Sequence, residues 1–170
     1  LAAFLYSQLC ELEKSRERRI DIWNQYYEGL RNVYQLKLPV VPQYATNNAH
    51  MFYVICPSFE IRSQLIEFLK ENNVQAVFHY LSLHKSEFNK KHAKEIPDLP
   101  MADKYTDCLL RLPLYYSLTD NDIVKIITLI HDFFLNFMRL HIVPDEKVIN
   151  RCIDAFNSVF PDENVFIVFL

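Results

Sequence analysis

Two histidines and a tyrosine lie within the stretch FHYLSLH, residues 78–84, and these residue types could do chemistry. His79, Tyr80 and His84 could act as metal ligands, as acid or base groups, as a wall of a substrate pocket, or as ordinary parts of a core. Metal binding is disfavoured, because helical imidazole ligands favour a spacing of four and structural zinc takes four nitrogen or sulfur ligands. The stretch contains no cysteine and no carboxylate, so we expect no metal there.

Nucleophilic catalysis has little support in the same stretch. Ser82 stands between the histidines, but no third group that would orient a triad can be recognised from the sequence. Side chains alternate along a strand, so His79 and Tyr80 cannot both point into a core, and one of them must face a cleft or a partner. For His79 the pattern alone favours a structural role, in the core or on the surface.

The glycine content excludes one whole class of site. Gly29 is the only glycine in 170 residues, against an average of about 7%. Loops that cradle phosphates need glycine for positive φ and for close approach of the backbone. The chain therefore contains no P-loop and no dinucleotide-binding fingerprint.

Charge and cysteine usage exclude further classes. The net charge is −3 and there is no long block of lysine and arginine, which argues against binding to nucleic acid or to an acidic membrane surface. The stretch 126–138 is interrupted by charge and is too short to span a bilayer, so we expect no membrane span. The four cysteines form no CxxC pair, which favours free thiols and a cytoplasmic location.

The first thirty residues are predicted to form one long amphipathic helix. Arg16 falls within its apolar stripe, either in a solvated charged turn or partly buried against an acid of another segment or subunit. Gly29, Pro39 and Pro42 mark the end of the helical region. Spacings of three and four relate the residues of the stripe: Leu5, Leu9, Leu12, Ile20, Trp23, Tyr27 and Leu30.

Strands and helices alternate after this helix, which predicts an α/β layer. The segment 85–100 is predicted to be a charged, irregular loop, followed by a short helix and an extended stretch fixed by Pro113. Thr119 or Asp120 caps a helix with Ile123, Ile126, Ile127, Ile130 and Phe134 facing inward. Before the loop we predict a strand at 50–56, a helix capped by Ser58 and ended by Asn72–Asn73, and a strand at 74–81.

The last stretch has a different character. Residues 138–170 predict a strand, a helix and a second strand, which is the opening β-α-β of a new unit headed by Met138. So short a stretch cannot bury a core of its own. We expect one domain at 1–136 and the start of a second at 137–170; the alternative is a C-terminal extension of the same domain.

Three motifs resemble a known family. NAHMFYV (48–54), VFHYLSLH (77–84) and RLPLYYSLT (111–119) occur in the order and at the intervals of the C-terminal domain of the DegT/DnrJ/EryC1/StrS sugar-nucleotide aminotransferases. The opening AAFLYSQLCELEKSRERRIDIWNQYYEGL resembles the long helix that precedes them. The resemblance covers residues 1–136 and is closest to the branch that forms dTDP-4-amino-4,6-dideoxygalactose.

This resemblance implies the small C-terminal domain of a fold-type-I, pyridoxal-phosphate-dependent homodimer. Such an enzyme moves an amino group from glutamate to the 4-keto carbon of a dTDP-linked 6-deoxyhexose, in polysaccharide biosynthesis. Its Schiff-base lysine, the acid on the pyridine nitrogen and the phosphate cradle belong to the preceding large domain. We therefore expect a fragment that is inactive alone and carries no catalytic residue.

By position, the resemblance implies that His79 and Tyr80 lie at the mouth of the active site near the sugar nucleotide. Asn48 and His50 lie on the neighbouring strand, and all four bind and position substrate. His84 lies farther out. The family commonly has proline where this chain has Leu81–Ser82, which we expect to loosen the loop.

Two further expectations concern the tail and an alternative function. The segment after Met138 resembles the start of a fucosyltransferase-like glycosyltransferase that adds 4-acetamido-4,6-dideoxygalactose to a lipid-linked sugar. The alternative to an enzyme is a non-catalytic α/β interaction module with an aromatic binding face. Thirteen phenylalanines and ten tyrosines would suit such an interface.

Overall fold

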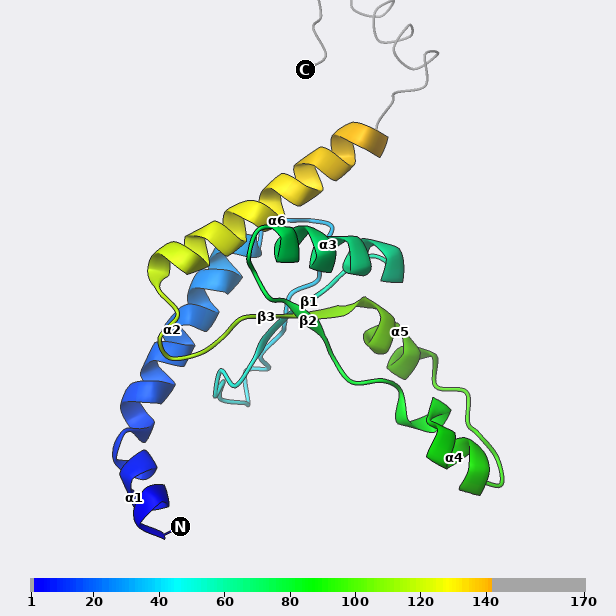
Figure 1. Ribbon diagram of the computed structural model, residues 1–170, viewed down its shortest axis with the longest axis horizontal. Coiled ribbons are helices and arrows are strands. Elements are labelled where there is room, and N and C mark those ends of the chain that lie inside the picture. The colour runs from blue at the N-terminus through cyan, green and yellow to red at the C-terminus, as the bar shows by residue number, and fades with distance from the viewer. Residues whose placement is uncertain (1, 142–170) are drawn as a thin grey trace, which may run out of the picture. The chain divides into compact units, whose positions relative to one another are not determined.

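A computed structural model describes residues 2–141 of the chain, and the side chains of residues 2–137 (Figure 1). The chain divides into two compact units, Leu1–Phe134 and Leu135–Leu170. The β-α-β unit predicted after Met138 lies outside the described residues, apart from the few at its start that belong to the last helix. The description below concerns the first unit.

The first unit contains a small sheet and several helices, which confirms the predicted α/β class. Its strands are β1 (Phe52–Ile55), β2 (Val77–Phe78) and β3 (Leu109–Leu112). Its helices are α1 (Ala2–Cys10), α2 (Leu12–Leu30), α3 (Phe59–Glu71), the 3-10 turn η1 (Leu83–Lys85), α4 (Glu87–His92), α5 (Pro100–Cys108) and α6 (Asp120–His141).

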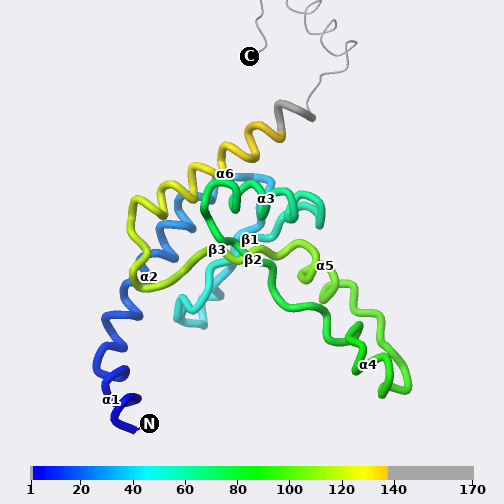
Figure 2. The backbone as a smooth tube through the Cα atoms, viewed as in Figure 1, coloured from blue at the N-terminus to red at the C-terminus, as the bar shows by residue number. Residues whose placement is uncertain are grey.

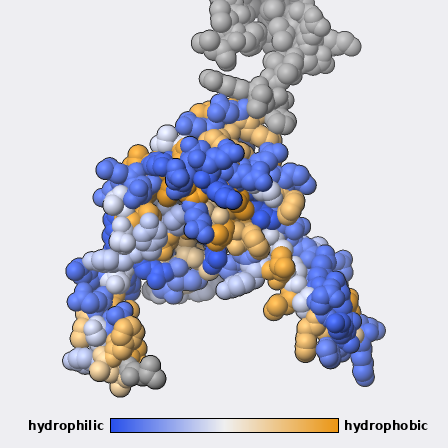
Figure 3. All heavy atoms as spheres, viewed as in Figure 1, coloured by the Kyte–Doolittle hydropathy of each residue, from blue (hydrophilic) through white to orange (hydrophobic). Residues whose placement is uncertain are grey.

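The predicted single N-terminal helix is wrong, because the chain forms two helices that meet at Glu11. No residue of α1 is buried, and Leu5, Leu9 and Leu12 are each more than half exposed. The buried stripe lies only on α2 and consists of Ile22, Trp23, Tyr26 and Leu30. Figure 3 shows apolar side chains at the surface over α1.

Arg16 belongs to a solvated charged turn, one of the two roles that its position left open. Its guanidinium pairs with Glu13 of its own helix at 2.8 Å, and both side chains are exposed. The next two arginines make the connections to other segments. Arg18 pairs with Asp120 at 2.9 Å, and Arg19 donates to the carbonyl oxygens of Ala49 and His50.

The sheet has the order β1-β3-β2, so the strand that comes last among residues 2–141 lies in the middle. Both outer strands are antiparallel to β3, and β1 and β2 are therefore parallel to each other. Figure 2 shows the chain leaving β2, passing through α4 and returning through α5 into β3. Only Val77 and Phe78 pair with β3, which is why the strand predicted at 74–81 is reduced to two residues.

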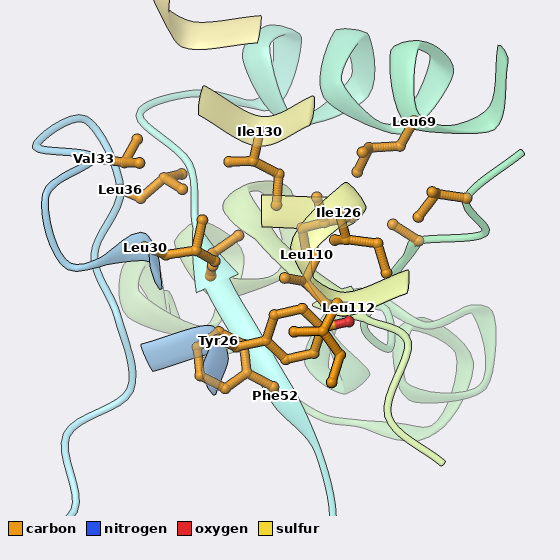
Figure 4. Packing of buried hydrophobic residues seen from close by; sticks show 14 of the residues in the cluster. Tyr26, Leu30, Val33, Leu36, Phe52, Leu69, Leu110, Leu112, Ile126 and Ile130 are labelled. Atoms are coloured by element: carbon orange, nitrogen blue, oxygen red, sulfur yellow. The ribbon is translucent and has the colours of Figure 1, made fainter. Parts of the chain in front are cut away.

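The core lies between one face of this sheet and the helices α2, α3 and α6, which gather on one side of the strands in Figure 1. Figure 4 shows Tyr26 of α2 beside Phe52 of β1, with Leu110 and Ile126 nearby. The Tyr26 hydroxyl donates to the carbonyl oxygen of Pro113 at 2.9 Å, and burial raises the pKa of Tyr26. The buried phenol is thus satisfied by the segment that follows β3.

Helix caps confirm two predicted boundaries and correct one predicted loop. The Ser58 hydroxyl accepts from the Ile61 amide at the start of α3, and Thr119 and Asp122 cap α6 reciprocally. The predicted irregular loop at 85–100 contains α4, whose first turn is capped by Ser86 and stabilised by a Glu87–Lys90 pair. The inward face predicted for the last helix is buried or partly buried in α6.

Gly29 lies where α2 and α6 approach closely. A Cβ atom at this position would lie 2.5 Å from Cδ1 of Ile127, and the His131 side chain reaches the Gly29 carbonyl oxygen at 2.8 Å. Gly29 lies near the end of the helix, as the sequence predicts, because α2 ends at Leu30; its own backbone is helical and its φ is not positive. Its lack of a side chain is what allows the two helices to pack.

We predict that Gly29→Ala lowers the free energy of unfolding by about 1 kcal/mol. Steric overlap with Ile127 costs more than the roughly 1 kcal/mol that alanine gains over glycine inside a helix. In an Ile127→Ala background the sign reverses, because the overlap is gone. Urea unfolding of the four proteins measures this cycle, and a stabilised Gly29→Ala single variant would contradict the close packing of α2 on α6.

Candidate functional site

The second face of the sheet, opposite the core, carries the candidate site. In the register of the sheet, Tyr53, Arg111 and Val77 lie abreast on β1, β3 and β2. Their neighbours Phe52 and Leu112 are buried in the core, so alternation turns these three toward the second face. His79 follows Val77 by two residues and comes directly after β2.

His79 and Tyr80 are adjacent in space as well as in sequence. Their ring centroids are 4.6 Å apart and their planes are inclined by 56°. Tyr80 is 76% exposed, whereas His79 is half-buried and its Nδ1 atom is enclosed without a hydrogen-bond partner among the described residues. Burial lowers the pKa of His79, and the positive charges of Arg111 and His50 lower it further. Both effects favour the neutral form of the imidazole.

Asn48 and His50 form one hydrogen-bonded unit in the loop before β1. The Asn48 Oδ1 atom accepts from the backbone amide of His50 at 3.2 Å and from its ring Nδ1 at 3.0 Å. Between them Ala49 is buried with φ at 49°. The Arg19 guanidinium holds the Ala49 carbonyl oxygen at 3.0 Å, so α2 fixes this strained turn.

The loop that carries Tyr80 is tied to α5, which corrects the prediction that Leu81–Ser82 loosens it. The Ser82 hydroxyl donates to Asp103 Oδ1 at 2.9 Å and lies 2.8 Å from the Thr106 hydroxyl. Thr106 in turn donates to the Tyr80 carbonyl oxygen at 3.4 Å. A serine hydroxyl thus provides by hydrogen bonding the restraint that a proline ring would provide covalently.

His84 is the only one of the predicted histidines that is buried, at 8% exposure. Its Nε2 atom lies 3.4 Å from Asp103 Oδ1, and Asn89 donates to its carbonyl oxygen at 3.0 Å. Lys85 pairs with the other oxygen of Asp103 at 2.6 Å, and this hydrogen bond holds the pKa of the carboxyl below its usual range. These contacts join η1, α4 and α5.

The candidate residues line two different hollows. One, of about 330 Å³, is lined by His79, Tyr80 and His84 together with mainly apolar residues of the 81–83 segment, of α5 and of the residues at either end of α5. The other, of about 170 Å³, brings His50 and Arg111 together. Neither hollow is lined by a lysine or a carboxylate. Asn48 lines neither hollow and acts through His50.

Arg111 is the residue of this face that sequence reasoning did not single out. It stands within the apolar run LLRLPL, where a charged residue between Leu110 and Leu112 must turn to the opposite face. That alternation is the signal that could have identified it. Its Nε atom is enclosed and has no hydrogen-bond partner within the part of the chain that the structure describes.

Within residues 2–137 no group of three or more histidine, cysteine or acidic side chains is arranged to hold a metal ion. None of the helices in residues 2–141 is long and apolar enough to cross a membrane.

The architecture is that of the aminotransferases, and the sequence places it in one family. The family model of the DegT/DnrJ/EryC1/StrS aminotransferase family matches residues 1–131, so the chain belongs to that family.

Relatives and solved structures agree with this assignment. The chain is 27% identical over 136 residues to the spore coat polysaccharide biosynthesis protein SpsC of Bacillus subtilis, covering 77% of this chain and 35% of SpsC. It is 30% identical over 116 residues to the dTDP-4-dehydro-2,3,6-trideoxy-D-glucose 4-aminotransferase of Saccharopolyspora spinosa, covering 68% and 29%. The crystal structure of S. venezuelae DesV in complex with a ketimine intermediate superposes with a TM-score of 0.71 at 25% identity, covering 78% and 35%. The chain spans about a third of the length of these relatives.

We predict that Ser82→Ala loosens the loop without unfolding the protein. Loss of a hydrogen bond worth about 1 kcal/mol raises the amide hydrogen exchange of residues 79–86 by roughly fivefold. Ser63→Ala is the matched control, because the Ser63 hydroxyl also donates one hydrogen bond, to the Phe59 carbonyl oxygen on α3. Unchanged exchange in the Ser82 variant would show that the loop does not depend on this contact.

Proposed function

We propose that this chain forms the substrate side of a pyridoxal-phosphate-dependent sugar-nucleotide aminotransferase. The enzyme moves an amino group from glutamate to the 4-keto carbon of a dTDP-linked 6-deoxyhexose, for cell-surface polysaccharide biosynthesis in the cytoplasm. One observation carries the proposal. The three family motifs, far apart in the sequence, form or directly flank three adjacent strands and bring His50, His79 and Arg111 to one sheet face.

The residues described do not fit the cofactor itself. A Schiff base needs an unprotonated lysine, and neither hollow at this face is lined by one. Lys85 lies nearby in sequence, but its pair with Asp103 raises the pKa of the amine and keeps it charged. We therefore propose that the cofactor is held by a part of a longer protein that this chain does not contain, which agrees with its coverage of a third of its relatives.

His79, Tyr80, Asn48 and His50 are the proposed substrate-binding residues. Tyr80 offers an exposed phenol, and His79 offers an imidazole whose Nδ1 has no partner among the described residues. Asn48 fixes the ring of His50, so that its Nε2 is directed consistently. These groups bind and orient, and the catalytic proton transfers fall to residues outside this chain.

A homodimer is part of the proposal. Phe4, Leu5, Tyr6 and Leu9 are each more than half exposed on α1, and a patch of this kind is normally covered by protein. We propose that a second subunit covers it.

The segment 137–170 is proposed to be the start of a second unit, which resembles the start of a glycosyltransferase.

A non-catalytic module with an aromatic binding face is not favoured by any contact. The exposed aromatic side chains are spread over many elements. They are Phe4 and Tyr6 on α1, Tyr34 and Tyr44 between α2 and β1, Phe59 on α3, Phe78 on β2, Tyr80 after β2, Phe88 on α4, Tyr105 on α5, and Tyr115 and Tyr116 between β3 and α6.

We predict that the longer protein, purified with its cofactor, transfers ¹⁵N from labelled glutamate to a dTDP-4-keto-6-deoxyhexose. His79→Ala lowers kcat/KM for the sugar nucleotide by about tenfold, because one positioning hydrogen bond is lost, and leaves the cofactor absorbance unchanged. His92→Ala, on α4, is the control and retains activity. Mass spectrometry of the sugar nucleotide measures transfer; no labelled product from the loaded wild-type protein would overturn the proposal.

A further inference from the structure

Arg111 differs from the other arginines among residues 2–137. Arg16, Arg18 and Arg31 each pair with a carboxylate. Two more donate to backbone carbonyl oxygens, Arg19 to Ala49 and Arg62 to Asp107. Arg111 has neither kind of partner in this part of the chain, and its Nε atom is enclosed.

An enclosed guanidinium nitrogen without a partner is costly. A buried donor on a charged group loses its water and regains nothing, which destabilises the fold unless something else binds there. The sheet fixes the position of Arg111, because β3 is the middle strand and places this residue between Tyr53 of β1 and Val77 of β2.

The groups around Arg111 are basic or neutral. His50 lines the same hollow, and the remaining lining residues are Met51, Gln75, Val77, Leu112, Pro113 and Leu114. His79 lies two residues beyond Val77, which is opposite Arg111 in the sheet, and its own Nδ1 also lacks a partner among the described residues. Arg111 and His50 therefore share a hollow whose lining contains no acid, and His79 is on the same face of the sheet.

We propose that Arg111, His50 and His79 form a binding site for an oxyanion of a small molecule, a carboxylate or a phosphate. The guanidinium supplies a fixed charge and a planar set of donors that suits either group. Asn48 Oδ1 accepts from Nδ1 of His50, so the Nε2 atom of His50 can donate to the oxyanion when it also carries a proton.

This site adds Arg111 to the proposed substrate face. Its existence can be tested without transamination, whereas the identity of its natural ligand rests on the proposed function. The two sources of an oxyanion there are the carboxylates of glutamate and the diphosphate of the nucleotide. Glutarate and thymidine 5′-diphosphate represent them as probes.

The test is a titration of the full chain with each probe, followed by NMR of the ¹⁵N-labelled histidine rings and the Arg111 Nε–H group. An oxyanion bound at this site favours the protonated rings, so the pKa of His79 rises and the Arg111 Nε–H resonance shifts. Arg111→Gln weakens binding of the responding probe by at least tenfold, and Arg111→Lys restores part of it. Arg31→Gln is the matched control, because Arg31 pairs with Glu28 on the exposed face of α2.

The outcomes separate the possibilities. A response to glutarate alone assigns the site to the amino donor, and a response to the diphosphate alone assigns it to the sugar nucleotide. An unchanged His131 resonance shows that the variants remain folded, because this ring bonds to Gly29 across α2 and α6. If neither probe shifts His79 or Arg111, or if the Arg111→Gln variant binds as well as wild type, the oxyanion site is wrong. Failure of ¹⁵N transfer with an intact probe response would refute the proposed function alone.

Discussion

The pairing of β3 with both β1 and β2 is the constraint on which the rest of the structure depends. Because β3 enters between two strands joined by α3, Leu110 and Leu112 complete the core on one face while Arg111 turns to the other. The same register brings Tyr53 and Val77 beside Arg111. Burial of the leucines therefore positions the arginine, and the stability of the core holds the geometry of the site.

The two loops beside the sheet are held by polar ties to different helices. Arg19 of α2 binds the turn that presents His50, and Ser82 connects the His79–Tyr80 segment to Asp103 of α5. Arg19 binds backbone carbonyl oxygens and Ser82 binds the Asp103 carboxylate, so neither hydrogen bond uses the side chains of His50, His79 or Arg111. The site residues on these loops are thus positioned from outside the site.

Elements with strong local signals could be predicted from the sequence, and elements set by tertiary pairing could not. Ser58 and Asn72 bound α3 as predicted, and the isoleucine spacing identified the buried face of α6. The exposure of Leu5 and Leu9 could not be inferred from the sequence, because the spacing of apolar residues on a helix does not show whether another segment covers them. The Ser82 contact and the isolation of Arg111 depend on strand order, which residue spacing does not encode.

The most direct test of the account is whether the second sheet face contacts the sugar nucleotide in the longer, cofactor-loaded protein. Methyl-labelled Met51 lines the hollow beside Arg111, whereas Met101 lies on α5 with its side chain exposed and serves as the internal reference. We expect intermolecular nuclear Overhauser effects from the bound dTDP-sugar to the Met51 methyl group and none to Met101. Contacts to Met101 alone, or to neither methyl group while the ligand is bound, would contradict the proposal that this face binds the sugar nucleotide.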